Sequence, residues 1–349
     1  SGTGGHLVPA LHIIRGLAQL RADTVVECIG SGKPLEEKIL VSNGFKRHLV
    51  AASGLKRRGI LGLLQFLAAL PVGILQCFSL FRRFKPDVVV GVGGYVSFLP
   101  VVVARLMGIP TWIHEAELHP GLANRVLGYF ADRISISFAD TKVKGRAKPV
   151  FTGHPVRPEL KGVERDEVRA GAPKRMLVLG GSQGARGLDH VVSEIAPMLQ
   201  QRGVEVVHQC RVENVELVVN LYRAARVQAS VVSFIDDMAG AYAWSDVVIS
   251  RAGASSVAEI SVVNRPTIFV PYPFQQGTHQ SDNARALASY GKALVVEENE
   301  PEFPKRLQRA LEELLDPARF RQMKSMPMEP RGLDAATSIA QGILSISRV

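Results

Sequence analysis

Short apolar runs that alternate with glycine turns and helical stretches are the feature that most constrains the fold of this 349-residue chain. In the first half these runs occupy residues 24–29, 86–94 and 111–115, and in the second half residues 176–179, 204–208, 246–250 and 267–270. Apolar, β-branched runs between helical segments predict parallel strands that are buried on both faces. Because both halves repeat this layout, we expect two α/β domains, each built on a doubly wound sheet.

The segment 152–174 is rich in proline, glycine and charge, and it predicts the boundary between the two domains. We place the first domain at residues 1–155 and the second at residues 156–331, which fits the usual domain size of roughly 150 residues. Residues 332–349 form a last helix whose apolar face carries Leu333, Ala336, Ile339, Ile343 and Leu344. We expect this helix to return to the first domain.

The charge and cysteine content narrow the classes of partner. A formal net charge of +10 favours binding of a polyanionic partner. The candidates are a nucleic acid, an acidic lipid and a phosphorylated substrate. The chain has three cysteines, and they lie far apart without any C-x-x-C or Cys/His cluster. This spacing argues against a structural zinc or a disulfide framework and fits a reducing cytosol.

Glycine turns at 2–5, 91–94 and 180–184 indicate anion sites at the carboxyl ends of strands. Glycine lets a ligand approach the main chain, and a following helix offers free N–H groups to a phosphate. Tight turns also use glycine for steric reasons alone, and no turn here has the spacing of the dinucleotide fingerprint, which argues against a nicotinamide enzyme. Because the first turn would normally follow a strand, we expect a strand to precede Ser1.

The segment 250–259 follows a buried strand and enters a helix through small residues. Glu259 could accept hydrogen bonds from the two hydroxyls of a ribose. Ser256 and Glu259 also have the spacing of a capping box, so spacing alone leaves the two roles open. The polar run after the next strand, residues 275–283, suits recognition of sugar hydroxyls, or it is an ordinary loop that leads into a helix at 282–290.

Residues 56–85 are the candidate membrane-binding segment. Basic residues close both ends of an uncharged stretch, 59–81, which is long enough to span a bilayer. Pro71 and two glutamines interrupt it, so we expect a helix or helix pair that lies at the interface and attracts anionic lipids. The alternative is a core helix that is buried on all sides.

Together these features resemble the MurG family over essentially the whole chain. The matching motifs, in order, are SGTGGH (1–6), GVGGYVS (91–97), HE (114–115), GHPVR (153–157), GGSQGA (180–185), FIDDM (234–238), AYAWSD (241–246), RAGASSVAE (251–259) and HQSDNA (279–284). The family fold is GT-B, in which two Rossmann-like domains with parallel sheets face each other across a cleft. Its members move N-acetylglucosamine from UDP-N-acetylglucosamine to undecaprenyl-linked lipid I, forming lipid II for peptidoglycan, at the inner face of the cytoplasmic membrane.

The resemblance implies a role for each matching residue. Arg157 and Ser182 would hold the donor diphosphate, Ile235 would meet the uracil, and Glu259 would bind the ribose. Gln280 would read the sugar hydroxyls, and His6 would be a general base or would orient the acceptor. The other implied substrate-binding residues are Thr3, Gly4, Gly5, Glu117, Ala254, Ser255, Ser256, Val257 and Ala258. The resemblance implies no cofactor, no metal and no nucleic acid.

The sequence departs from the family pattern at residues 114–117, where HEAE replaces the usual HEQN. A carboxylate at Glu117 near a diphosphate is repulsive unless it is screened. Alternative functions are a related transferase that acts on another lipid such as diacylglycerol, and a non-catalytic nucleotide-sugar binder. Inversion at the sugar by a metal-independent displacement remains the main hypothesis.

Overall fold

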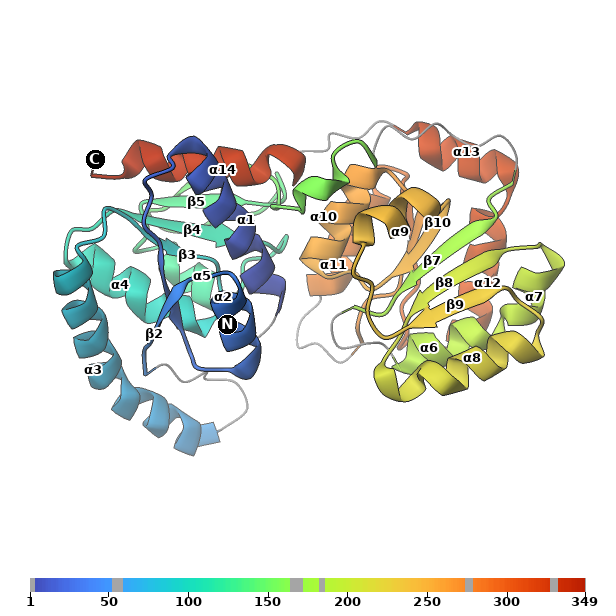
Figure 1. Cartoon of the computed structure of the whole chain (residues 1–349), viewed down its shortest axis with the longest axis horizontal. Coiled ribbons are helices and arrows are strands. Elements are labelled where there is room, and N and C mark those ends of the chain that lie inside the picture. The colour runs from blue at the N-terminus through green and yellow to red at the C-terminus, as the bar shows by residue number, and fades with distance from the viewer. Residues whose placement is uncertain are drawn as a thin grey trace. The chain divides into compact units, whose positions relative to one another are not determined.

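The computed structural model describes residues 4–51, 59–163, 172–181, 186–273, 279–326 and 332–348. The chain divides into two compact units, residues 1–156 with 334–349, and residues 157–333. The sequence-based boundaries were 155/156 and 331/332. Both units are α/β with parallel sheets, as predicted (Figure 1).

The second unit holds one parallel sheet in the order β12-β11-β10-β7-β8-β9. Its strands are β7 (Arg175–Leu179), β8 (Glu205–Gln209), β9 (Ala229–Val232), β10 (Val247–Ser250), β11 (Thr267–Phe269) and β12 (Ala293–Val295). The chain enters at the central strand β7, builds one side through β8 and β9, and then builds the other side from β10. The order therefore reverses between β7 and β10, and ligands of doubly wound sheets bind at the carboxyl ends of such strands.

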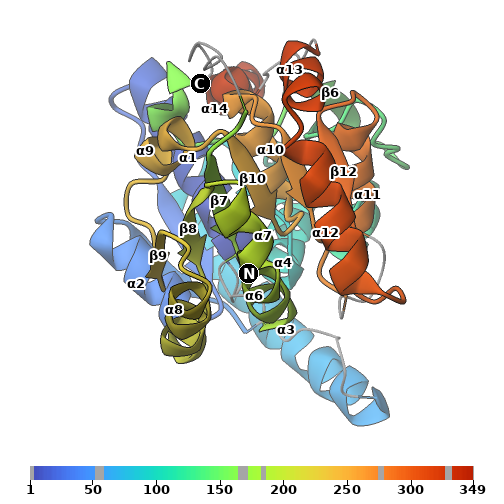
Figure 2. The same cartoon turned by 90° about the vertical axis from the view of Figure 1, so that its right-hand side faces the viewer.

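Helices cover both faces of this sheet (Figures 1 and 2). They are α6 (Arg186–Glu194), α7 (Ala196–Gln201), α8 (Val215–Ala224), α9 (Met238–Trp244), α10 (Ala254–Val263), α11 (His279–Ala288), α12 (Phe303–Leu314) and α13 (Pro317–Ser325), with short 3-10 turns at η2 (Pro158–Leu160) and η4 (Val212–Asn214). The main core packs Leu188, Val218 and Leu307 from three of these helices against Met176 and Ile249 of the strands. Helix α11 begins at His279, so the predicted start at residue 282 was wrong.

The first unit has a four-stranded parallel sheet, β3-β4-β5-β6, and a two-stranded parallel sheet, β1-β2. The strands are β1 (Glu27–Gly30), β2 (Lys46–Leu49), β3 (Val89–Gly91), β4 (Thr111–Glu115), β5 (Arg133–Ile136) and β6 (Lys148–Phe151). The helices are α1 (Gly4–Leu20), α2 (Pro34–Ser42), α3 (Gly59–Phe84), α4 (Phe98–Leu106), α5 (Leu122–Leu127) and α14 (Gly332–Ile346), with the 3-10 turn η1 (Tyr95–Ser97). The runs predicted at 24–29 and 86–94 thus form strands that are shorter than expected.

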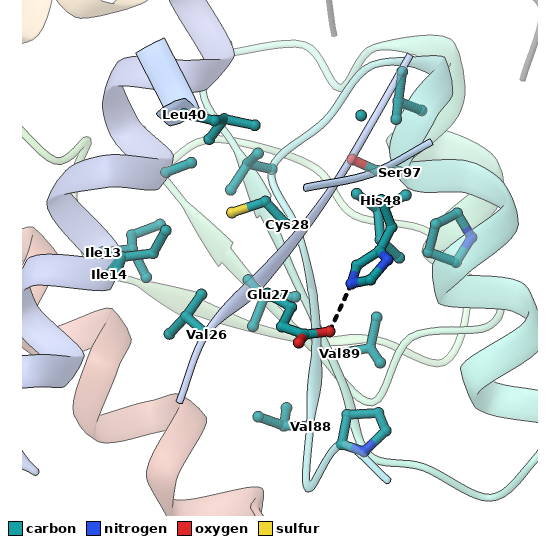
Figure 3. A pocket seen from close by; sticks show the side chains of 18 of the residues that line it. Ile13, Ile14, Val26, Glu27, Cys28, Leu40, His48, Val88, Val89 and Ser97 are labelled. Atoms are coloured by element: carbon teal, nitrogen blue, oxygen red, sulfur yellow. Dashed lines mark hydrogen bonds and ion pairs between the residues drawn. The ribbon is translucent and has the colours of Figure 1, made fainter. Parts of the chain in front are cut away.

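A cavity of about 260 Å³ in the first unit is lined by residues of β1, β3, α1 and α3 (Figure 3). Among the described residues, β1 and β3 each pair on one side only. Most of the lining is apolar, and the ion pair between Glu27 Oε2 and His48 Nε2, at 2.6 Å, lies in its wall. The strand expected before Ser1 stays a prediction.

Helix α14 packs on the first unit beside α1, as the sequence predicted for the last helix (Figure 1). Ile339 and Ile343 join a small core with Trp112 and Ile13. Gly342 allows this packing, because a Cβ there would lie 2.2 Å from the Trp112 ring.

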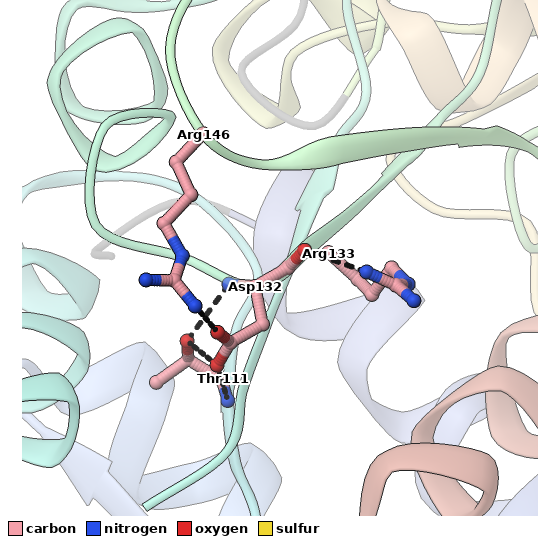
Figure 4. A network of polar contacts seen from close by, with 4 residues as sticks. All are labelled: Thr111, Asp132, Arg133 and Arg146. Carbon is pink, nitrogen blue, oxygen red and sulfur yellow. Dashed lines mark hydrogen bonds and ion pairs between the residues drawn. The ribbon is translucent and has the colours of Figure 1, made fainter. Parts of the chain in front are cut away.

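A polar network ties the amino ends of β4 and β5 together (Figure 4). The Thr111 hydroxyl and backbone N–H donate to Asp132 Oδ2 at 2.9 and 3.0 Å, and Arg146 donates to Oδ1 at 2.7 Å. This network lies at the end of the strands opposite to the glycine turn that follows β3, and it links β4 to the start of β5.

Candidate active site

In the second unit, a buried carboxylate lies beside the start of α10. Glu259 is 7% exposed; its Oε1 accepts a hydrogen bond from Arg157 Nε at 2.8 Å, and its Oε2 accepts one from the Tyr242 hydroxyl at 3.3 Å. Burial raises the pKa of Glu259, while Arg157 and Tyr242 act in the opposite direction. The site therefore holds a desolvated carboxylate whose charge is supported by two donors.

The capping-box alternative for Glu259 is wrong. Helix α10 begins at Ala254 with Gly253 as its N-cap, so Ser256 lies inside the helix and cannot cap it. No side chain caps this end, and a Cβ at Gly253 would meet no atom within 4 Å. The positive end of the helix dipole thus lies beside a position that has room for a ligand, and such a helix start favours an anion.

The small residues predicted to flank the nucleotide form the first turns of α10. Ser255, Ser256 and Ala258 are partly exposed, whereas Ala254 and Val257 are buried. Small side chains at the exposed positions leave the backbone accessible to a flat ligand. The contact predicted between these residues and the nucleotide stays a prediction.

Gln280 joins the loops that follow β10 and β11. Its side-chain oxygen accepts hydrogen bonds from the backbone N–H groups of Ala252, at 3.3 Å, and Tyr272, at 3.0 Å. The amide oxygen is therefore occupied by the protein, and the amide NH₂ is the group that would donate to a sugar hydroxyl. Gln280 lies in the first turn of α11 rather than in a loop before it.

Ile235 lies in the turn between β9 and α9, next to the exposed Phe234. Asp237 caps α9 by accepting a hydrogen bond from Gly240 N at 2.8 Å, so the Asp pair opens a helix as expected. Thr3 and Ser182 lie outside the described residues.

An arginine that the sequence analysis missed holds several strand-end loops of the second unit together. Arg251 is 6% exposed, and its Nη1 donates to the carbonyl oxygens of Val270, at 3.0 Å, and Pro271, at 3.1 Å. It also pairs with Glu298 and lies against Gly181 of the glycine turn. Its place in the RAGASSVAE motif was visible, but nothing local in the sequence reveals its partners.

In the first unit, His6 lies over the glycine turn that follows β3. Gly93 and Gly94 have φ angles of 91° and 74°, which L side chains rarely adopt. A Cβ at Gly93 would lie 3.3 Å from His6 Cε1 and 3.7 Å from Asn124 Nδ2. The close approach of His6 thus depends on glycine at this position.

Burial keeps the imidazoles of this region neutral. It lowers the pKa of His6 to about 4, and the His6 Nδ1 atom has no hydrogen-bond partner among the described residues. Burial also lowers the pKa of His114 to about 3. His114 Nδ1 lies 3.0 Å from Ser135 Oγ, and His114 Nε2 lies 3.2 Å from His154 Nδ1.

Glu115 is a buried carboxylate whose partners the sequence did not reveal. It is 3% exposed and accepts hydrogen bonds from the backbone N–H groups of Glu117 and Gly121 and from Asn124 Nδ2, at 2.9–3.1 Å. Burial raises its pKa to about 7. Glu117 therefore contacts Glu115 through its backbone N–H, and the ligand role predicted for its side chain stays a prediction.

Comparisons with known proteins agree with this arrangement. Residues 1–136 match the glycosyltransferase family 28 N-terminal domain, and residues 175–341 match the family's C-terminal domain. The UDP-N-acetylglucosamine–N-acetylmuramyl-(pentapeptide) pyrophosphoryl-undecaprenol N-acetylglucosamine transferase of Syntrophus aciditrophicus is 34% identical over 100% of this chain and 97% of its own length. The enzyme of the same name from Coxiella burnetii is 40% identical over 85% of this chain and 83% of its own length.

Solved structures show the same fold. The crystal structure of Acinetobacter baumannii MurG superposes with a TM-score of 0.81 at 27% identity, covering 99% of this chain and 97% of that one. A UDP-GlcNAc 2-epimerase from Neisseria meningitidis superposes at 0.65 with 15% identity, over 99% of this chain and 98% of that one, which speaks for the fold alone. The chain therefore belongs to glycosyltransferase family 28 and, within it, to the MurG family.

Proposed function

We propose that the chain transfers N-acetylglucosamine from UDP-N-acetylglucosamine to the muramoyl 4-hydroxyl of lipid I, which yields lipid II and UDP. Membership of the MurG family supports the reaction and both substrates. The observation that carries the proposal is the pair Arg157–Glu259 beside the uncapped start of α10, at the strand ends where doubly wound sheets bind nucleotides.

For the donor, Glu259 would accept hydrogen bonds from the ribose hydroxyls, and Arg157 with Ser182 would hold the diphosphate. Ile235 would meet the uracil through its backbone, residues 254–258 would flank the nucleotide, and Gln280 would read the sugar. Arg157 forms an ion pair with Glu259. Donor binding would therefore bring a second anion to the same guanidinium, which has further N–H groups to offer.

From the first unit, Thr3, Gly4 and Gly5 would face the donor, and His6 would act as the base for the acceptor hydroxyl or would orient it. A neutral imidazole with a free nitrogen atom can take the proton of the 4-hydroxyl while that oxygen bonds to the anomeric carbon. The bond from this carbon to the UDP oxygen breaks at the same time, which inverts the anomeric centre. The electron pair goes to the diphosphate, where Arg157 and backbone amides would stabilise the added charge without a metal ion.

We also propose that the chain works as a peripheral protein at the cytoplasmic face of the cell membrane. No helix of the described residues is both long enough and apolar enough to cross a bilayer. Helix α3 is one continuous helix, and Val72, Ile74, Leu75 and Phe78 are 41–67% exposed, so this part of it is not the fully buried core helix of the alternative interpretation. Arg82 and Arg83 follow in its last turn, where they would meet anionic headgroups.

The test is release of UDP from UDP-N-acetylglucosamine by the purified chain in detergent. Release should require lipid I, and diacylglycerol should not replace it; the comparisons give no support to that acceptor. Binding of NAD in preference to UDP, or UDP release that lipid I does not stimulate, would contradict the proposal.

His6→Ala tests the base. We expect kcat to fall by about 10²-fold or more, as for loss of a general base, with little change in the Kd for UDP. An equal loss of turnover and of UDP affinity would remove His6 from this role.

A further inference from the structure

Tyr242 is a buried residue in contact with the carboxylate assigned to the ribose, and no role has yet been given to it. It lies on α9 and is 0% exposed. Its hydroxyl donates to Glu259 Oε2 at 3.3 Å, whereas Arg157 donates to the other carboxylate oxygen, Oε1. We propose that Tyr242 is a positioning residue that fixes the carboxylate of Glu259 for recognition of the ribose hydroxyls, an inference that rests on the proposed donor site.

The geometry of the carboxylate supports this role. An ionised carboxylate offers about four lone-pair positions on its two oxygens. Arg157 and Tyr242 take one position on each oxygen, which leaves one on each for the two vicinal hydroxyls of a ribose. The χ3 torsion of a free glutamate has broad minima, so its carboxylate plane can rotate. Here each carboxylate oxygen accepts a hydrogen bond, which restricts this rotation.

Tyr242 is itself held from its backbone. The Tyr242 carbonyl oxygen accepts hydrogen bonds from Arg265 Nε and from Ser245 Oγ, both at 3.0 Å. At the other end of α9, Asp237 caps the helix immediately after the turn that carries Ile235. One short rigid helix thus connects the turn assigned to the uracil with the carboxylate assigned to the ribose.

Tyr242 is suited to donate and not to accept. Burial and the adjacent Glu259 raise the pKa of Tyr242 well above its usual value, so the hydroxyl keeps its proton throughout the physiological range. A fixed donor also favours the charged form of Glu259, which burial disfavours.

The experiment compares binding of UDP and of 2′-deoxyuridine diphosphate by titration calorimetry in the full chain. Tyr242→Phe retains the ring that fills the core and removes only the hydroxyl. We expect the Kd for UDP to rise about three- to tenfold, which corresponds to loss of one modest hydrogen bond to a charged group, while the Kd for the deoxy ligand changes little. The preference for UDP over the deoxy ligand should therefore narrow.

Two further variants make the result decisive. Tyr222→Phe removes the hydroxyl of another buried tyrosine of the second unit, which lies 3.2 Å from His208 Nδ1, and it should leave the preference unchanged even if it lowers the melting temperature. Glu259→Gln should reduce the preference more than Tyr242→Phe does. A preference that persists in Glu259→Gln would refute the ribose site and Tyr242 with it. If the preference narrows in Glu259→Gln but not in Tyr242→Phe, or if Tyr242→Phe weakens both ligands equally, only the role of Tyr242 fails.

Discussion

Gly342→Ala tests the packing of α14 on the first unit. Alanine improves helix propensity by about 1 kcal/mol in a helix interior. The added Cβ would, however, lie 2.2, 2.7 and 3.0 Å from three atoms of the Trp112 ring, which is 2% exposed. Forcing an extra methyl group into a packed core costs about 1–3 kcal/mol.

The Trp112 ring cannot move away without a further loss. Its Nε1 donates to Ser135 Oγ at 3.0 Å, a bond whose net worth is about 1 kcal/mol. The overpacking and this bond together exceed the gain in helix propensity. We therefore expect Gly342→Ala to lower the free energy of unfolding of the first unit by about 1–3 kcal/mol.

The assay is urea unfolding followed by tryptophan fluorescence. The chain has two tryptophans, so Trp244→Phe in every variant leaves Trp112 as the single reporter of the first unit. Gln341→Ala, at the exposed neighbouring position of α14, is the matched control and should stay within about 0.5 kcal/mol of the parent. A Gly342→Ala protein as stable as the control, or more stable, would refute the reasoning, because helix propensity would then outweigh the contact with Trp112.

Four other outcomes follow from the structure. The raised pKa of Glu115 means that the native state keeps a proton that the unfolded state has lost between about pH 4.5 and pH 7, so stability should fall by about 3 kcal/mol as the pH rises through this window. Urea titrations should show this slope flattened in Glu115→Gln and unchanged in Glu194→Gln, at an exposed position of the second unit. Turnover should persist in excess chelator, and complete loss of turnover would count against the metal-free displacement. Leu75→Glu on α3 should weaken sedimentation with vesicles that contain anionic lipid, whereas Val212→Glu, exposed on the second unit, should not. An extended β-branched segment joined to Ser1 should raise the melting temperature by filling the cavity between β1 and β3, and a glycine-serine extension of equal length should not.

The sequence predicted the strands well where the run is buried along nearly its whole length. The runs at 111–115 and 176–179 form β4 and β7 almost to the residue, because buried parallel strands need apolar side chains on both faces. Other strands are shorter than predicted: β1 begins only at Glu27, after the apolar Val25 and Val26, and β3 begins only at Val89. The glycine turn after β3 was also predicted, because backbone positions with positive φ angles favour glycine, and the glycines are visible in the sequence.

Partners that are distant in sequence could not be predicted. Glu259 meets Arg157 across 102 residues and Tyr242 across 17 residues, so the two contacts join α10 to the residue before η2 and to α9. The local pattern Ser-x-x-Glu pointed equally well to a capping box. The fold excludes the capping box by starting α10 three residues earlier than a cap at Ser256 would require.

The buried ionisable groups of the two units have different surroundings. In the first unit, burial is the main cause that lowers the pKa of His6 to about 4 and that of His114 to about 3, so both rings are uncharged at neutral pH. In the second unit, a buried carboxylate is accompanied by a guanidinium and a hydroxyl that favour its charged form. An uncharged imidazole suits a base that must accept a proton from a neutral sugar hydroxyl, because an imidazolium could not. A charged carboxylate suits recognition of two ribose hydroxyls, because only the ionised form accepts from both donors without offering a competing proton. Arg157 and Tyr242 thus offset part of the burial that raises the pKa of Glu259, and they favour the form that the proposed ribose recognition requires.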